Sequence, residues 1–448
     1  MEPSAGESGE TQLKLRRFPP FMRFWLASTV SDFGTYITSV ALSVLILVTM
    51  DGTPVDQGLV NAARWAPYLL FGLVAGVWID RFPRGTVLVG GDFGRGVILA
   101  GLCAMAVTGV ISVPAVVVLM FVFGTLALTS DAAHQSFLPQ LVPRSLLTRA
   151  NARLQQGDTV AQTAGGAAAG GLVALVGAPF ALLFDAASYF LSAAVLLTLD
   201  RPAVQRQGQR KQRLRHKVAE GLQWVYGRSR LPPLAWSTHT WFIGSAILGT
   251  AMPILILKDL GLGALGLGLV MGCAGVGAVI GTTLSIRVGR RWGTGAAMVA
   301  SRLAQPLAIA LVALAPAAAG TPLAGESYGS PADWPGGLWA AFILAGAGQL
   351  LFGLLMGVEG PLEMGYCQAV TPDRLLARMS ATMRSVNRGM IVVGAPLGGV
   401  IAAAAGTAVA LWTSAAFLLL ASLLLLFSDF RYARTEDHLL SDEEAVLP

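Results

Sequence analysis

Long apolar runs recur along the whole chain, separated by short polar or charged segments. As helices that rise about 1.5 Å per residue, runs of about 20 apolar residues are long enough to cross a hydrocarbon core about 30 Å thick. The pattern therefore predicts an all-α membrane protein with twelve transmembrane helices. The expected spans are residues 21–48, 57–79, 87–110, 113–136, 150–176, 179–199, 234–256, 264–288, 296–316, 338–366, 380–404 and 407–427.

The composition strengthens this interpretation, because 54% of the 448 residues are hydrophobic and only 12% are charged. Soluble domains carry about 25% charged residues, and a water-soluble protein this apolar would lack the polar groups to cover its surface. The three cysteines, Cys103, Cys273 and Cys367, lie far apart and show no metal-ligand spacing. We therefore expect neither a metal nor another cofactor.

Basic residues gather in alternate connecting segments. If the N-terminus lies inside, the predicted outer loops contain Lys258 and no other Lys or Arg, whereas every inner segment is basic. This asymmetry follows the positive-inside rule and predicts that both termini are cytoplasmic. The basic segment 200–233 is expected to face anionic lipid of the inner leaflet. It carries no fold signature for nucleic-acid binding, so no nucleic-acid partner is expected.

That basic segment divides the chain near its middle, and the two parts repeat one another. The segment QLVPRSLLTRAN, residues 140–151, aligns with QAVTPDRLLARMS, residues 368–380, once a single residue is gapped. Pro143, Leu147 and Arg149 then match Pro372, Leu376 and Arg378, each at an offset of 229 residues. Two halves of six helices each cross the membrane an even number of times, which predicts parallel repeats, as in secondary transporters. The expected parts are a tail (1–20), a first six-helix bundle (21–199), a cytoplasmic linker (200–233), a second six-helix bundle (234–427) and a tail (428–448).

The segment GVWIDRFPRG, residues 76–85, resembles the loop between spans two and three of the major facilitator superfamily, Gly-x-x-x-Asp-Arg-x-Gly-Arg-Arg. Gly76, Asp80, Arg81 and Arg84 match, while Pro83 replaces the expected glycine. The segments GGDFGRG, FLPQLVPRSLLTRANA and LLFDAASYFLSAAVLL are similar to the branch with macrolide-efflux pumps, siderophore exporters and transmembrane secretion effectors. The resemblance implies the major facilitator fold and alternating access between its two pseudo-symmetric halves.

The resemblance also implies a cytoplasmic gate, in which Asp80 pairs across to the second half near the start of span eleven. Asp158 on span five is expected to form a further lock with an arginine of the second half. The alternative is a solvated turn that only sets topology. For Arg81 alone, the solvated turn explains the residue as well as the gate does. For Asp80 the gate is favoured, because aspartate contributes little to topology and needs another reason to be there. The candidate gate residues are Gly76, Asp80, Arg81, Arg84, Asp158, Arg384 and Arg388.

Two charged side chains fall near the middle of predicted spans. Asp32 lies about eleven residues into span one, and Arg64 reaches a similar depth on span two. An ionisable side chain at the bilayer centre costs about 2.5–3.5 kcal/mol on insertion scales, so each needs a reason to be there. In the resembled fold, spans one, four, seven and ten line the central cavity. Spans three, six, nine and twelve brace it from outside. Asp32 is thus the candidate proton carrier with Arg64 as its partner, and a permanent structural ion pair is the alternative.

Further titratable groups lie on the expected cavity-lining spans. Asp131 and His134 are three residues apart on one helical face, and Glu359 and Glu363 are four apart at the matching end of span ten. One interpretation is that these groups complete a proton path or attract a cationic cargo. The alternative is that they are solvated residues at the cytoplasmic mouth of the cavity. Asp185 and Arg302, on bracing spans, are expected to be satisfied internally. The full set of cavity candidates is Tyr36, Asp131, His134, His239, Gln349, Glu359 and Glu363.

No lysine follows a glycine in the chain, so the phosphate loop GxxxxGK is absent and an ion gradient is the expected energy source. The expected function is proton-coupled export of a small amphipathic or hydrophobic molecule, a drug or secondary metabolite, by a monomer in the plasma membrane of a bacterium. The cavity helices offer many apolar and few polar contacts, which favours lipophilic cargo. The alternatives are a lipid or lysolipid flippase and a non-transporting receptor or scaffold. No enzymatic activity is expected.

Overall fold

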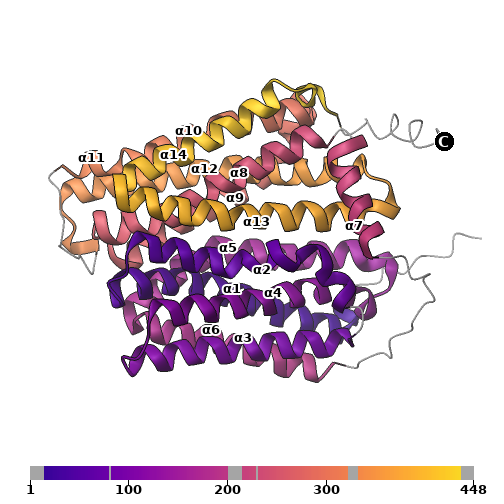
Figure 1. Ribbon diagram of the computed structural model, residues 1–448, viewed down its shortest axis with the longest axis horizontal. Helices are drawn as coiled ribbons and strands as arrows, with labels where there is room; N and C mark the ends of the chain where they lie inside the picture. Colours follow the sequence, from indigo (N-terminus) through magenta and orange to yellow (C-terminus); the bar gives the residue numbers. More distant parts are fainter. Residues whose placement is uncertain (1–14, 80–81, 200–213, 229–230, 321–330, 435–448) are drawn as a thin grey trace, which may run out of the picture.

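Two bundles of long helices lie side by side in the computed structural model of the protein (Figure 1). The structure describes residues 15–79, 82–199, 214–228, 231–320 and 331–434. The first bundle consists of α1 (Pro19–Val44), α2 (Pro54–Ile79), α3 (Arg84–Val107), α4 (Val113–Leu141), α5 (Leu147–Val176) and α6 (Ala178–Leu197). The second consists of α8 (Pro232–Ile254), α9 (Gly263–Trp292), α10 (Thr294–Ala313), α12 (Gly336–Ala369), α13 (Asp373–Ala405) and α14 (Thr407–Leu426).

Two shorter helices complete the fold and mark its two ends. The linker contributes α7 (Leu214–Gln223), and α11 (Ala315–Ala319) follows α10. They lie at opposite ends of the bundles in Figure 1, and we call these the linker end and the far end. The π-helical turns η2 (Leu45–Thr49), η4 (Trp224–Arg228) and η5 (Leu255–Asp259) and the 3-10 turns η1 (Leu15–Arg17), η3 (Arg144–Leu146), η6 (Pro331–Asp333) and η7 (Asp429–Tyr432) extend or join the helices.

The predicted fold class is confirmed. Within the described ranges the chain is helical and contains no strand. Eleven helices there are long and apolar enough to cross a membrane. The helix α2 is the long helix outside this set. Its 26 residues cover the second predicted span, so each predicted span overlaps a long helix. The count of twelve membrane crossings and the cytoplasmic termini stay predictions.

The same packing pattern occurs in both bundles. In the first bundle, α1 packs against α5 and α6, α2 against α4, and α3 against α6. In the second bundle, α8 packs against α13 and α14, α9 against α12, and α10 against α14. The bundles meet where α2 lies along α13 and α5 lies along α9. In each contact the second helix of one bundle lies along the fifth helix of the other, as expected for two parallel repeats.

A glycine at the same place in each half turns the chain into the last helix. Gly177 follows α5 with φ 82°, and Gly406 follows α13 with φ 93°. A side chain at such a positive φ would clash with the backbone, so glycine suits both turns. The two glycines are 229 residues apart, the offset at which the two sequence segments align.

The apolar core is shared at one end of the molecule and divided at the other. One cluster joins both bundles at the far end and includes Leu45, Ile256 and Leu411. At the linker end each bundle has a core of its own, one around Phe137 and one around Tyr366. Among the described residues, the bundles therefore share a buried apolar core at the far end and have separate apolar cores at the linker end.

Glycines bring α5 and α9 together in the half nearer the far end. A Cβ atom added at Gly170 would lie 2.6 Å from the carbonyl oxygen of Ala264 and 2.8 Å from the Cα of Gly268. Such contacts are too short for a side chain, so the two backbones touch only because both positions are glycine. Small residues allow this close approach of helices in lipid, where packing rather than water exclusion drives association.

We expect Gly170→Ala to destabilise the protein, because the new methyl group meets backbone atoms that cannot rotate away. The cost of such overpacking is about 1–3 kcal/mol in the free energy of unfolding. Thermal unfolding of the detergent-purified protein measures it. Gly171→Ala is the matched control, since a Cβ there meets nothing within 4 Å. Equal unfolding midpoints for the two variants would show that the close approach is not needed.

Candidate functional site

A cavity of about 580 Å³ lies in the first bundle, in the half nearer the linker end. All six helices of that bundle contribute to its lining, and Arg384 and Arg388 of α13 close it toward the second bundle. A cavity of this size holds a drug-sized molecule.

The expected division into lining and bracing helices is wrong for this bundle. Asp92 and Arg95 of α3, and Tyr189 and Ser192 of α6, line the cavity although both helices were expected to brace it. The Arg95 and Tyr189 side chains are long enough to reach past their own backbone into the bundle interior.

The lining is also far more polar than the sequence predicts. Carboxylates and guanidinium groups occur in equal number, so the formal charges of the lining cancel. The eight charged side chains are Asp32, Arg64, Asp92, Arg95, Asp131, Asp158, Arg384 and Arg388. The expectation of few polar contacts is thus wrong, because it counted residues along the expected lining helices and ignored the long side chains of the others.

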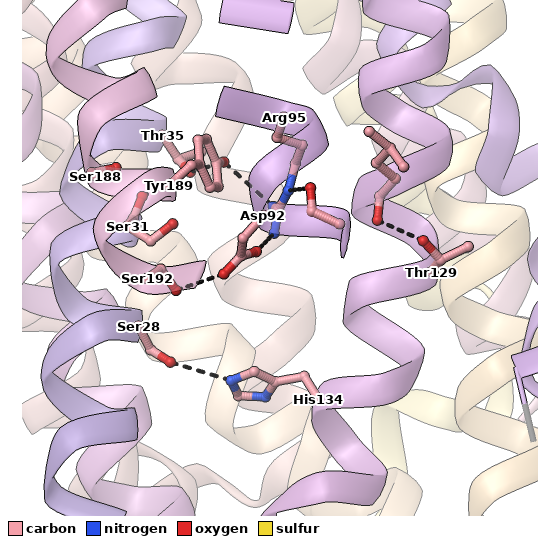
Figure 2. A network of polar contacts seen from close by, with 12 residues as sticks. Ser28, Ser31, Thr35, Asp92, Arg95, Thr129, His134, Ser188, Tyr189 and Ser192 are labelled. Atoms are coloured by element: carbon pink, nitrogen blue, oxygen red, sulfur yellow. Dashed lines mark hydrogen bonds and ion pairs between the residues drawn. The ribbon is translucent and has the colours of Figure 1, made fainter. Parts of the chain in front are cut away.

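A polar network on α3 and α6 forms one wall of the cavity (Figure 2). Asp92 and Arg95 form an ion pair, and the Ser192 hydroxyl donates to Asp92 at 2.5 Å. Arg95 also donates to the Tyr189 hydroxyl at 3.4 Å, and its guanidinium carbon lies 4.3 Å from the centre of the Tyr189 ring. Sequence reasoning missed this network. The spacing of three residues between opposite charges in GGDFGRG was the available signal.

An ion pair between the two bundles closes another side of the cavity. Arg388 of α13 donates to the Asp131 carboxylate of α4 at 2.7 Å, and Tyr68 of α2 donates to the same oxygen at 2.8 Å. The Arg388 guanidinium also lies over the rings of Tyr68 and Trp65, at 4.5 and 5.1 Å from their centres. Asp131 was predicted to face the cavity, but its pairing with the second bundle was not predicted.

The structure describes only some of the residues of the predicted cytoplasmic gate. Asp80 and Arg81 lie outside the described residues. Gly76 is in the last turns of α2, and Arg84 is the first residue of α3. Of the two arginines expected to receive Asp80, Arg388 pairs with Asp131, and the Asp80 contact itself stays a prediction.

The structure does not form the predicted Asp32–Arg64 ion pair. The Arg64 guanidinium instead lies near the rings of Trp65 and Phe123, 5.7 and 5.5 Å from their centres. In the part of the chain that the structure describes, the side chains of Asp32 and Arg64 make no hydrogen bond and no ion pair to another residue. Both face the cavity, so it contains an acid and a base that are not paired with each other.

Three other candidates of the first bundle have local partners. His134 contacts the Ser28 hydroxyl at 3.4 Å, and its ring centre lies 4.6 Å from that of Phe24. Asp158 accepts a hydrogen bond from Gln155 of its own helix at 3.2 Å, where a lock with the second half was predicted. Tyr36 packs against Gly165 of α5 and is not part of the cavity lining.

The acids predicted on span ten belong to a buried cluster in the second bundle. Arg302 of α10 is 1% exposed; its Nε donates to Glu359 at 2.5 Å, and its Nη2 donates to Glu363 at 3.2 Å and to Thr238 at 2.9 Å. Gln305 donates to the other Glu359 oxygen at 2.9 Å. Arg302 is thus satisfied by its neighbours, as is Asp185, whose carboxylate accepts from Thr38 and Ser188.

The remaining second-bundle candidates also lie away from the cavity lining. His239 contacts the Tyr226 hydroxyl and the Asn387 side chain, each at 2.6 Å. Gln349 is buried on α12. The structure therefore brings Asp32, Arg64, Asp131, His134, Asp158, Arg384 and Arg388 together around one cavity. It places the cavity candidates of α8 and α12 elsewhere, namely His239, Gln349, Glu359 and Glu363.

A family model described as a transmembrane secretion effector matches residues 15–445. The chain belongs to this family of major facilitator transporters. With eleven helices among the described residues that are long and apolar enough to cross a membrane, the chain is a multi-pass membrane protein of a transporter family.

Curated relatives of this chain include bacterial proteins named as transporters. The MFS-type transporter YfiS of Bacillus subtilis (strain 168) is 24% identical over 243 residues, which cover 53% of this chain and 56% of YfiS. The staphyloferrin A transporter of Staphylococcus aureus (strain NCTC 8325 / PS 47) is 27% identical over 180 residues, which cover 39% of this chain and 44% of that protein. The chain spans about half the length, or less, of the first curated relatives that it matches.

Solved structures of transporters share the fold of this chain. The nucleoside transporter NupG superposes with a TM-score of 0.69 at 11% identity, covering 91% of this chain and 98% of NupG. A bacterial homologue of the iron transporter ferroportin in its inward-facing state gives 0.68 at 16% identity, covering 94% of this chain and 100% of that one. The same kind of homologue in an outward-facing state gives 0.57 at 17% identity, covering 91% and 98%. At these identities the likeness shows the fold.

Proposed function

We propose that this transporter is a proton-coupled exporter of small amphipathic molecules, with Asp32 as its proton carrier. The single observation that carries the proposal is the state of Asp32 in the cavity. Asp92 and Asp131 are held in ion pairs and Asp158 accepts a hydrogen bond, whereas the Asp32 carboxylate has no such partner among the described residues. It can therefore gain and lose a proton without breaking an ion pair, and carboxylates at membrane depth often serve as proton relays.

The arrangement of the cores supports alternating access. The bundles share an apolar core at the far end and have separate cores at the linker end, where the cavity lies. The asymmetric basic loops favour a cytoplasmic linker end. The cavity would then be loaded from the cytoplasm, and the better superposition on the inward-facing ferroportin homologue is in line with this orientation.

Uphill transport by Asp32→Asn tests the proposal. Proteoliposomes with an imposed pH gradient are expected to accumulate an amphipathic probe with the unaltered protein. They are expected to lose accumulation with Asp32→Asn, because the amide cannot exchange a proton. Accumulation is followed with a panel of radiolabelled amphipathic drugs, and proton movement with an entrapped pH dye.

Asp373→Asn is the matched control, since Asp373 is an exposed acid in the first turn of α13 and is not part of the lining. Both variants must reach the same level in the membrane. If Asp32→Asn still accumulated the probe against its gradient as the unaltered protein does, the proposal would be wrong. Transbilayer movement of labelled lipid that needs no gradient would identify a flippase instead.

A further inference from the structure

Arg64 is a charged group in the cavity that the proposed proton cycle does not use. Its guanidinium contacts the faces of Trp65 and Phe123 and makes no hydrogen bond to another described residue. Cation–π contacts are worth about 0.5–2 kcal/mol, less than the cost of about 2.5–3.5 kcal/mol for an arginine at mid-membrane depth. The guanidinium also attracts the Asp185 carboxylate at longer range, but that carboxylate accepts its hydrogen bonds from Thr38 and Ser188. The five N–H donors of Arg64 are therefore available to a molecule in the cavity.

The chemistry that suits such a group is a carboxylate. A guanidinium presents parallel donors that match the two oxygens of a carboxylate, and the pair is stronger where surrounding groups exclude water. The rings of Trp65 and Phe123 beside the guanidinium supply an apolar surface for the body of the same molecule. Arg64 is therefore placed to hold the acidic end of an aromatic or otherwise apolar molecule.

If the cargo is exchanged for protons, as in the function proposed above, the cargo must also compete with the proton for binding. An anion bound in the cavity favours the protonated form of a nearby acid, so cargo and proton would bind together and travel in the same direction. Exchange in opposite directions needs cargo and proton to compete. A basic group on the cargo that occupies the Asp32 carboxylate competes with the proton directly.

We propose that Arg64 is the specificity-determining residue for an amphoteric cargo. Arg64 binds the carboxylate of this cargo, its apolar body lies against Trp65 and Phe123, and its basic nitrogen pairs with Asp32. The balanced charge of the lining fits a cargo without net charge, since the remaining acids and arginines include the Asp92–Arg95 and Asp131–Arg388 pairs.

Binding of charge-matched probes tests this assignment without any gradient. The probes are a fluoroquinolone with a piperazine and a carboxylate, and the dipeptide Phe–Phe, each as the zwitterion, the methyl ester and the N-acetyl acid. Affinities for the full chain come from ligand-induced thermal stabilisation of the purified protein. The zwitterion of at least one scaffold is expected to bind about tenfold or more tightly than its ester, the range of a charge-assisted hydrogen bond.

The Arg64 variants separate charge recognition from a structural role. Arg64→Gln is expected to weaken the zwitterion and the N-acetyl acid about tenfold while leaving the ester unchanged, and Arg64→Lys should restore part of the loss. Equal weakening of the ester, equal binding of zwitterion and ester by the unaltered protein, or binding of no form on either scaffold would each overturn the proposal. Because binding is measured at equilibrium, it can hold even if Asp32→Asn still pumps, so the failures of the two proposals are distinguishable.

Discussion

Arg302→Leu is expected to lower the free energy of unfolding by about 3–5 kcal/mol, the cost of removing one partner from a buried ion pair. Arg302 is 1% exposed and donates to both Glu359 and Glu363. Its loss leaves the Glu359 carboxylate buried with only the Gln305 hydrogen bond. A charge left in such surroundings has no water to replace the guanidinium.

Thermal unfolding of the purified variant, together with its yield in the membrane, measures the loss. The rescue variant combines Arg302→Leu with Glu359→Gln and Glu363→Gln, so that no unpaired charge remains. It is expected to recover most of the stability, because a neutral cluster of similar volume carries no uncompensated charge. An unfolding midpoint of Arg302→Leu equal to that of the unaltered protein would show that the carboxylates do not need the guanidinium.

The helices were predictable because the thickness of the bilayer fixes the length of an apolar run. Differences occur where helices extend beyond the apolar part. The eleventh span was expected to begin at residue 380, but α13 begins at Asp373. Its first turns carry Arg374 and Arg378, and Arg378 pairs with Glu220 of the linker helix α7. A hydropathy pattern detects the membrane-buried part of a helix and misses such polar extensions.

The site was predictable residue by residue but not pair by pair. Asp32, Arg64 and Asp131 were recognised because a charge within an apolar run is costly, and the structure places all three on one cavity. Their partners depend on how the helices rotate and on how far each side chain reaches. Arg64 therefore lies near two aromatic rings rather than Asp32, and Asp131 pairs with a residue 257 positions away.

The ion pair between Asp131 and Arg388 joins the two bundles in the wall of the cavity, in the half nearer the linker end. A contact across bundles that move relative to each other cannot keep the same geometry in both states, so its loss changes their populations. Both side chains are about a third exposed, 39% and 28%, so we expect the low end of coupling energies, about 1 kcal/mol or about fivefold in the equilibrium.

Arg388→Gln is accordingly expected to lower the equilibrium constant in favour of the described state about fivefold. A cysteine introduced as Gln155→Cys in the cavity lining, with Cys103, Cys273 and Cys367 replaced by alanine, reports the change. Its labelling by a charged maleimide from the linker end should slow by up to the same factor, because the population that presents the cavity to that end falls. Arg374→Gln, which removes an exposed charge from the same helix, should label at the original rate.

The exchanged pair, Asp131→Arg with Arg388→Asp, decides between pairing and a simple effect of charge. If the attraction between the two side chains holds the described state, the exchanged pair restores labelling toward the original rate, while either substitution alone slows it. A double-mutant cycle isolates this coupling from the separate contacts of Arg388 with Tyr68 and Trp65. Strictly additive effects of the two substitutions would mean that Arg388 acts through the aromatic rings, and the bridge would not contribute to switching between states.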